Sequence, residues 1–442
     1  MYQMTASDIT GPDEETICQL HRFYSEIYIK VFNQRDDMQN SIESVNHTQI
    51  EQSIDTSVKW SNYYPPIPRK FVEGLCNIST NTLIKHEQEG LITPHKVKHG
   101  ALEMVAYTTD DVHKLFKKRG FNLNKKDQAE VIAIWSQKGG VGKSAFTQHL
   151  SSLLSLVGKT LVIDLDSQAD ITALLGGNIK FADLVSPDDE QEPTILELMD
   201  WTLEDGHEYP YRKMEFDQVI KKISPTLHLV QSDLDISEIN YSLNRLPLKD
   251  RHDEHGNVKP AILYMLKDAI AKIKKEYDFI LFDCPPNIET CNVNALFAAN
   301  RIIIPLELEA KCLKTMRRNE DFLFRLKDLH PDFHWDKILV IPNKFRRENI
   351  KIKALGKLQD IYFERTDVQL SQTVFSNAAI IDKCSELKEP MYAVATKFGK
   401  EYKSSAPQAK EFTDYFWVVI HEILDAPLDH LIFSEAQQSL DN

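Results

Sequence analysis

The chain has 442 residues, of which 42% are hydrophobic and 27% charged, so it is long enough for two or three domains with hydrophobic cores. Its 52 Lys and Arg against 66 Asp and Glu give a net charge of −14, which argues against a wholly basic nucleic-acid coat protein and against a protein held on anionic lipid by overall charge. No apolar run reaches the ~18 residues of a membrane span, and the start of the chain lacks the basic and apolar regions of a signal peptide, so we expect a cytoplasmic protein.

Residues 1–60 carry a net charge of −6 and contain one clear helical pattern. Apolar side chains recur at three- and four-residue steps between Thr16 and Phe32, which predicts an amphipathic helix. An amphipathic helix buries its apolar face against another part of the protein. This helix either docks on its own domain or pairs two subunits, and the sequence leaves both possibilities open. We therefore treat residues 1–60 as an N-terminal helical segment and a candidate for dimerisation.

The next segment, residues 61–125, resembles a winged helix-turn-helix domain, and residues 61–128 carry a net charge of +4. Apolar residues at 71, 72 and 75 predict a first helix. After a short turn, Ser79 is the expected N-cap of a second helix, and Gly90 is expected to end it. The first two helices are therefore predicted to lie on either side of residues 76–78.

A two-stranded wing and a third helix are predicted to follow. Leu91–Ile92 and Val105–Tyr107 are the expected wing strands, joined by a polar loop. Thr108 with Asp111 indicates a capping-box variant that opens a helix running to Arg119.

A second helix placed in the major groove of DNA would present the polar side chains of its first turn to base edges, and lysines would contact phosphates. The DNA-binding candidates of this segment are Ser79, Thr80, Asn81, Thr82, Lys85, Lys96 and Lys98. The alternative is a small helical domain that contacts only proteins, but the local positive charge favours DNA.

A glycine-rich loop follows the buried-strand pattern of residues 131–135 and precedes an amphipathic helix that Gly158 ends. Strand, glycine-rich loop, Lys-Ser and helix in this order predict a phosphate-binding loop, because backbone amides and a helix N-terminus attract anions. Lys143 is expected to bridge the terminal phosphates and Ser144 to ligate Mg²⁺. The predicted nucleotide-binding residues are Gly139, Gly140, Val141, Gly142, Lys143, Ser144 and Ala145.

Two features distinguish this loop from the common Walker loop: Gln137 replaces its first glycine, and Lys138 is an additional lysine. KGGVGKS resembles the deviant Walker A motif of the ParA/MinD group of ATPases. The resemblance implies that Lys138 reaches the phosphates of the facing subunit in a nucleotide-sandwich dimer and takes part in catalysis with Lys143. The alternative for Lys138 is a solvated loop charge.

Two acidic residues, Asp164 and Asp166, close the next apolar run, which begins at Thr160. At positions i and i+2 they project from one side at the carboxyl edge of a parallel sheet, where ligands bind. The run resembles the DxDxQ motif of the same group. That resemblance implies that Asp166 orients the attacking water and that Asp164 helps to hold hydrated Mg²⁺; a capping or loop role is the alternative for Asp164.

A third apolar run, residues 278–283, ends on Asp283, which is the expected Walker B acid and contacts Mg²⁺ through water. Residues 301–305 and 338–343 predict further strands of the same sheet. The expected fold of residues 126–442 is therefore α/β, a doubly wound and mostly parallel sheet with C-terminal helices. Arg346 stands where a guanine-reading Asp would be, so adenine is expected, with Asn343 as a candidate base contact.

The resemblance to ParA-type partition ATPases covers about residues 60–400. It implies a Mg²⁺-dependent ATPase of weak intrinsic rate that is cytoplasmic and nucleoid-associated. It also implies a homodimer that binds DNA non-specifically with ATP, represses its own operon through the N-terminal domain, and is stimulated by a ParB-like centromere-binding partner. Candidates for the non-specific DNA surface are Lys314, Arg317, Arg318, Arg346, Arg347, Lys351 and Lys353.

Two related functions would require features that are not found in this sequence. A MinD-like positioning ATPase would end in a basic amphipathic helix, whereas residues 408–442 are rich in acids, and no membrane partner is expected. A nitrogenase-type iron protein needs cluster cysteines, but the six cysteines form no CxxC motif. A transcriptional regulator that ATP merely switches remains the alternative, and it would bind only its operator.

Overall fold

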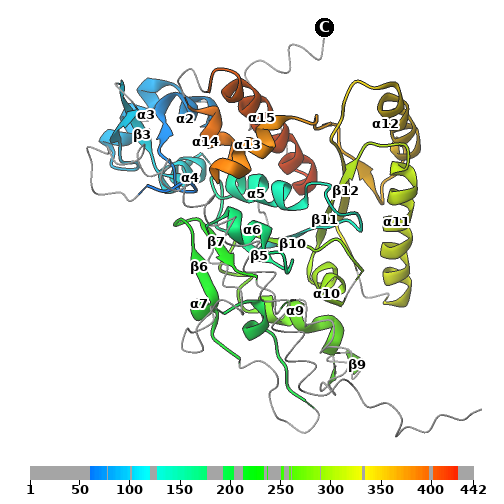
Figure 1. The fold of residues 1–442 in the computed structure, drawn as a ribbon. Coiled ribbons are helices and arrows are strands. Elements are labelled where there is room, and N and C mark those ends of the chain that lie inside the picture. Colours follow the sequence, from blue (N-terminus) through cyan, green and yellow to red (C-terminus); the bar gives the residue numbers. More distant parts are fainter. Residues whose placement is uncertain are drawn as a thin grey trace, which may run out of the picture.

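The computed structural model describes residues 60–426 with gaps at 77, 100–101, 120–126, 177–192, 204–212, 233–235, 237–249, 253–257, 260, 289, 331–333 and 398–401. The helix predicted between Thr16 and Phe32 lies outside the described residues. The described chain forms a large α/β region with a group of small N-terminal elements beside it (Figure 1).

The α/β region is built on an eight-stranded sheet in the order β13-β12-β11-β4-β10-β5-β7-β6. All neighbouring strands are parallel except β6 and β7. The strands are β4 (Glu130–Ile134), β5 (Thr160–Asp164), β6 (Ile220–Lys222), β7 (Leu227–Val230), β10 (Phe279–Asp283), β11 (Arg301–Glu307), β12 (Lys337–Asn343) and β13 (Gln369–Leu370). The predicted α/β fold with a mostly parallel sheet is confirmed.

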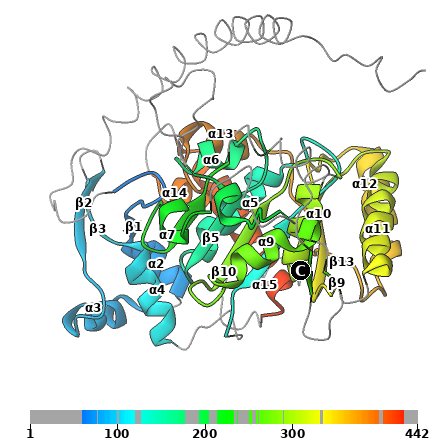
Figure 2. The same ribbon diagram turned by 90° about the horizontal axis from the view of Figure 1, so that it is seen from below.

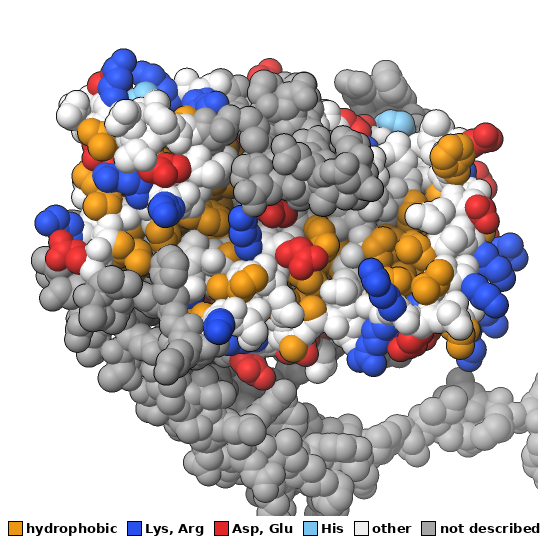
Figure 3. All heavy atoms as spheres, turned by 90° about the horizontal axis from the view of Figure 1, so that it is seen from above, with side chains coloured by type: hydrophobic (Ala, Val, Ile, Leu, Met, Phe, Trp, Pro, Cys, Tyr) orange, Lys and Arg blue, Asp and Glu red, His pale blue; other side chains and the backbone are white. Residues whose placement is uncertain are grey.

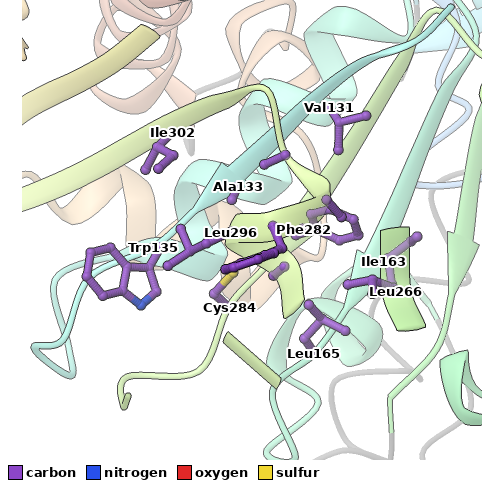
Figure 4. Packing of buried hydrophobic residues seen from close by; sticks show 14 of the residues in the cluster. Val131, Ala133, Trp135, Ile163, Leu165, Leu266, Phe282, Cys284, Leu296 and Ile302 are labelled. Carbon is purple, nitrogen blue, oxygen red and sulfur yellow. The ribbon is translucent and has the colours of Figure 1, made fainter. Parts of the chain in front are cut away.

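Both faces of this sheet are covered, as the alternation of side chains along β4 shows. Val131 and Ala133 enter one core with α9 (Ala261–Ala271), α10 (Thr290–Ala298), α11 (Cys312–Leu329) and α12 (Asn349–Tyr362), and Figure 4 shows part of that core. Ile132 and Ile134 enter the opposite core with α5 (Lys143–Leu154), α13 (Ala379–Leu387), α14 (Met391–Ala395) and α15 (Ser405–Leu424). Successive strand residues point to opposite faces, so a strand buried on both sides is apolar throughout.

Shorter elements fill the remaining connections. They are α6 (Asp170–Leu174), the 3-10 turn Ile195–Leu198, α7 (Phe216–Val219), and the small hairpin of β8 (Arg251–His252) and β9 (Val258–Lys259). Helices α11 and α12 lie side by side at one end of the sheet (Figures 1 and 2). No helix among the described residues has the length and apolar character needed to cross a bilayer.

The N-terminal elements are β1 (Ile67–Pro68), α2 (Arg69–Cys76), α3 (Thr80–Gln88), β2 (His95–His99), β3 (Leu102–Tyr107) and α4 (Thr109–Lys118). Their caps are as predicted: Ser79 accepts from the Thr82 amide, and Thr108 forms a capping box with Asp111. Gly90 follows α3 with a positive φ of 70°. The three helices therefore occur in the predicted order, while a DNA-binding role stays a prediction.

The expected first wing strand at Leu91–Ile92 is wrong, because β2 begins only at His95. The Leu91 amide donates to the His86 carbonyl and so belongs to the end of α3. Pro94, which has no amide hydrogen, then delays the start of pairing with β3. Lys96 and Lys98 consequently lie in strand β2 and not in the loop of the wing.

The N-terminal elements pack directly on the α/β region. Val72, Leu83 and Phe116 share one buried cluster with Leu150 and Leu154 of α5. The Phe71 ring stacks on Tyr392 of α14 with centroids 6.2 Å apart, and the Asn62 amide donates to the Leu387 carbonyl at 3.1 Å. The N-terminal elements therefore contact α14 and the end of α13 directly and share a buried cluster with α5.

Candidate nucleotide site

The glycine-rich loop lies between β4 and α5, at the carboxyl edge of the central strands. Gly140 has a φ of 70° and Gly142 a φ of 94°, a left-handed conformation that glycine adopts without a steric penalty. Gly142 is the N-cap of α5, so the amides of the first turn have no side-chain cap. The sequence places its glycines where the loop needs positive φ, and the free amides are available to an anion.

Lys143 and Asp283 meet at this edge. Lys143 is 7% exposed, and burial lowers the pKa of its amine while Asp283 and Asp166 oppose that shift. Asp283 is fully buried, and burial raises the pKa of its carboxyl to about 7, against the opposing effect of the Ser144 and Thr147 hydroxyls and of Lys143. The Thr147 hydroxyl donates to Asp283 Oδ1 at 2.9 Å.

Asp164 and Asp166 have different surroundings despite their spacing. Asp164 is fully buried: Oδ1 accepts from the Asp166 amide at 3.0 Å, and Oδ2 accepts from the Thr172 amide and hydroxyl at 3.0 and 2.7 Å. Burial raises the pKa of Asp164 well above its ordinary value, and Asp283 adds to the increase. Asp166 is partly exposed, and its Oδ1 accepts from the Gln168 amide at 3.0 Å.

The donor groups at this edge fit a hydrated Mg²⁺ ion. Asp283 pairs with Asp164 in the sheet register, so two carboxylates lie on adjacent strands beside Ser144. Among the described residues, Asp283 Oδ2 has no hydrogen-bond partner although it is buried. A divalent cation that prefers oxygen ligands would stabilise these carboxylates in their charged form.

Lys138 lies beside two acidic residues that the sequence analysis did not single out. Its Nζ atom is 2.6 Å from Glu307 Oε2 and 2.9 Å from Glu309 Oε1, at the end of β11. Glu307 and Glu309 have the same i, i+2 spacing after a strand as Asp164 and Asp166, and this was the available signal. In the single chain, Lys138 is therefore neutralised by Glu307 and Glu309.

Asn343 is placed against the loop and not in open space. It is 2% exposed, and its Nδ2 donates to the Val141 carbonyl at 2.8 Å. Its Oδ1 accepts from the Lys344 amide, also at 2.8 Å. Asn343, the expected base contact, thus donates one hydrogen bond to a backbone carbonyl and accepts one from a backbone amide.

The residues predicted to contact DNA in the N-terminal segment differ in exposure and in their hydrogen-bond partners. Asn81 and Lys85 are exposed on α3. Thr80 is exposed but donates to Glu73, and the Ser79 hydroxyl is shared with Thr82. Lys96 on β2 is 3.2 Å from Glu103, and the side chain of Lys98 lies outside the described residues.

The basic candidates of the α/β region lie on or next to α11 and α12. Lys314, Arg317 and Arg318 are exposed on α11, and Arg346, Arg347 and Lys353 are exposed around the start of α12. Lys351 is half-buried, and its Nζ donates to the Lys344 carbonyl at 2.6 Å. Figure 3 shows Lys and Arg side chains at both ends of one face, over the N-terminal elements and over α11 and α12, with acidic side chains between them.

Several known proteins are similar to this chain. Residues 129–329 match the family described as an AAA domain. The sporulation initiation inhibitor protein Soj of Bacillus subtilis is 27% identical over 186 residues, which are 42% of this chain and 61% of Soj. The cell division protein PomZ of Myxococcus xanthus is 26% identical over 305 residues, 68% of this chain and 78% of PomZ. The chromosome partitioning protein ParA of the same organism is 26% identical over 276 residues, 62% and 84% of the two chains.

The solved structures show the fold. An ATP complex of Cyanothece McdA superposes with a TM-score of 0.50 at 18% identity, and the match covers 68% of this chain and 98% of McdA. The α/β region thus shares its fold with McdA, a mixed α/β fold with a mostly parallel sheet. Soj is matched over less than two thirds of its length, so the activity of the whole chain does not follow from that likeness.

Proposed function

We propose that this chain, whose α/β region has the ParA/MinD-like P-loop fold, is a DNA-partition ATPase that hydrolyses ATP with Mg²⁺. The observation that supports this most is the composite edge formed by β4, β10 and β5. It combines a loop with positive-φ glycines, a buried lysine, and two buried carboxylates in register. These are the groups that phosphoryl transfer requires for positioning and for charge stabilisation.

Each residue of the edge has a proposed task. The backbone amides of residues 139–145 bind the phosphate chain, and Lys143 balances the charge of its terminal phosphates. Ser144, Asp164 and Asp283 hold Mg²⁺ directly or through water. Bound Mg²⁺ would supply positive charge at the phosphate oxygens. Asp166, which is partly exposed beside the loop, orients the attacking water, and Lys138 acts across a dimer after leaving Glu307 and Glu309.

DNA is the proposed binding partner of this protein. The names of two relatives refer to chromosome partitioning and to cell division, which supports a role in moving or positioning large cellular structures. The exposed basic residues on α11 and α12 provide a non-specific DNA surface, and α3 provides an operator-reading surface through which the protein represses its operon. A ParB-like DNA-binding protein is the proposed activator of hydrolysis, and a homodimer on the nucleoid is the proposed active state.

An electrophoretic comparison tests this function. Purified protein is mixed with ATP, ADP or no nucleotide, and then with random DNA or with the DNA upstream of its own coding sequence, at two salt concentrations. We expect ATP-dependent binding to random DNA that weakens steeply with salt, because phosphate contacts release counterions. Replacing Arg317 and Arg318 by Ala should weaken that binding, and Lys327→Ala on the same helix is the matched control.

The second candidate function is an ATP-switched transcriptional regulator. It is favoured by the N-terminal elements, whose second helix exposes Asn81 and Lys85. Binding to the upstream DNA alone, with no ATP-dependent binding to random DNA, would exclude the partition role and support the regulator.

A further inference from the structure

Thr147 is a buried threonine of α5 that stands one turn after Ser144, a proposed Mg²⁺ ligand. Thr147 is 0% exposed, whereas Ser144 is half-buried. Residues three positions apart lie on the same face of a helix, so the two hydroxyls lie on one side of α5. The side of α5 that begins with Ser144 therefore continues into the core with a second hydroxyl.

The Thr147 hydroxyl connects α5 with the end of β10. It lies 3.1 Å from the Lys143 carbonyl and 2.9 Å from Asp283 Oδ1, and it can donate to either oxygen. A bond to the carbonyl four residues earlier is common for threonine in a helix. The bond to Asp283 is not local, because Asp283 lies 136 residues further along the chain. One hydroxyl hydrogen is thus shared between the backbone of Lys143 and a buried carboxylate.

The two carboxylate oxygens of Asp283 have different surroundings. Oδ1 accepts from the Thr147 hydroxyl, and Oδ2 is buried without a hydrogen-bond partner among the described residues. A buried carboxylate oxygen without a partner is unfavourable unless a donor or a cation meets it. Asp283 lies between Ile134 and Asp164 in the sheet register, at the edge where the glycine-rich loop leaves β4. Of the two oxygens, Oδ2 is therefore the one left for a cation.

Thr413 of α15 makes the same bond to its own helix without a carboxylate beside it. It is 3% exposed, and its hydroxyl donates to the Ala409 carbonyl four residues earlier at 2.7 Å. That hydroxyl makes no other hydrogen bond within the part of the chain that the structure describes. Thr147 and Thr413 are therefore alike in residue type, burial and backbone bond, and they differ in the contact with Asp283.

We propose that Thr147 is a positioning residue for Mg²⁺, whose hydroxyl holds Asp283 Oδ1 so that Oδ2 is presented to the ion. The inference rests on the proposed nucleotide function and deepens it, because it adds a residue of α5 that acts on the ion through Asp283. Groups that orient a metal ligand contribute to metal affinity without touching the metal. Thr147 therefore contributes to the Mg²⁺-dependent part of ATP binding and not to the part that the glycine-rich loop provides without metal.

The test measures the affinity of the full chain for ATP by calorimetry, once with Mg²⁺ and once with excess EDTA. The ratio of the two affinities reports the contribution of the ion. Thr147→Val keeps the shape of the side chain and removes the hydroxyl, and Thr413→Val is the matched control, because it makes the same change away from any carboxylate. We expect the ratio to fall about tenfold or more in Thr147→Val, with unchanged affinity in EDTA, and to stay at the wild-type value in Thr413→Val.

Thr147→Ser keeps a hydroxyl at the same position, so its ratio should stay close to that of the wild type. Thermal melting identifies variants that do not fold, and Thr147→Ala with Thr413→Ala then replaces the valine pair. The inference is overturned if the folded variant without the hydroxyl keeps the wild-type ratio, or if Thr147→Ser loses as much as that variant. A wild-type chain that does not bind ATP, or that binds it equally with Mg²⁺ and with EDTA, instead contradicts the proposed function itself.

Discussion

Charge at the nucleotide site is set by burial as much as by residue type. Asp164 and Asp283 are both fully buried, and burial raises the pKa of both carboxyls, whereas Asp166 two residues from Asp164 stays partly exposed. The same strand end thus supplies one carboxylate that favours a cation and one that is accessible to water. This difference supports separate tasks for Asp164 and Asp166.

Two substitutions should separate binding from turnover. Lys143→Ala removes the buried cation beside the loop, so we expect ATP affinity to fall by about a hundredfold or more. Asp166→Ala leaves the loop intact, so affinity should stay close to the wild-type value while turnover falls by about 10²-fold or more. Calorimetry and a phosphate-release assay measure the two quantities, with exposed Asp360→Ala as the control. Normal turnover in Asp166→Ala would refute the water-orienting role.

Helix α5 is buried on almost every side. It connects the glycine-rich loop to the sheet, to α15 and to the N-terminal elements, and ten of its residues from Lys143 to Leu154 are buried. The Gln148 side chain donates to the Tyr63 hydroxyl, which comes from the chain before α2. Helix α5 therefore links the glycine-rich loop physically to the chain before α2.

His149 on α5 predicts an acid sensitivity. Its ring is 1% exposed, neither nitrogen has a hydrogen-bond partner among the described residues, and burial lowers its pKa to about 3. The unfolded chain binds a proton at this group below about pH 6.5 and the folded chain does not, so stability should fall as the pH decreases from about 6.5 toward 3. Denaturant unfolding at several pH values measures this slope, and His149→Leu should reduce it. An unchanged slope in His149→Leu would assign the acid sensitivity to other groups.

The end of α15 is fixed to the amino edge of the sheet by charge. The buried Arg301 guanidinium contacts Glu130 at 3.1 Å and Asp425 at 2.9 Å, and its Nη1 also donates to the Ile423 carbonyl at 2.5 Å. Removal of one partner from such a network is strongly destabilising, because it leaves a buried charge uncompensated. It anchors the last described helix on β4 and β11.

At the scale of the whole molecule, the N-terminal elements and the α/β region share one hydrophobic cluster. Phe116 of α4 is fully buried in the cluster that also contains Leu150, Phe416 and Trp417. Two regions that bury their surfaces against each other are expected to unfold together. The shared core also connects the nucleotide-site helix α5 physically to the N-terminal elements.

Truncating the shared core should therefore destabilise both regions. Phe116→Ala is expected to lower the free energy of unfolding by about 3–5 kcal/mol, the usual cost of removing a fully buried ring. The measurement is denaturant unfolding followed by fluorescence of the buried tryptophans of the α/β region. Lys118→Ala at the end of α4 is the control. An α/β transition that does not shift in Phe116→Ala would show that the two regions unfold independently.

Strands β4, β5, β10, β11 and β12, the glycine-rich loop and the acids Asp164 and Asp283 could be predicted from the sequence, because apolar runs and glycine-rich segments are local properties of the chain. The sequence also determined the caps at Ser79 and Thr108. It misplaced the first wing strand, because the Leu91 amide is used to end α3. The hydrogen bonds of a helix cap can be predicted from neighbouring residues. The pairing of a strand cannot, because it depends on residues elsewhere in the chain.

Which of these residues come into contact depends on the tertiary structure. The strand order brings Asp283 opposite Asp164, places Glu307 and Glu309 against Lys138, and sets Asn343 on the Val141 carbonyl. These pairs join residues far apart in the chain, and their contacts depend on how parallel strands are ordered in the sheet. The composition likewise gave a net charge of −14, and only the fold placed the basic side chains at two ends of one face (Figure 3).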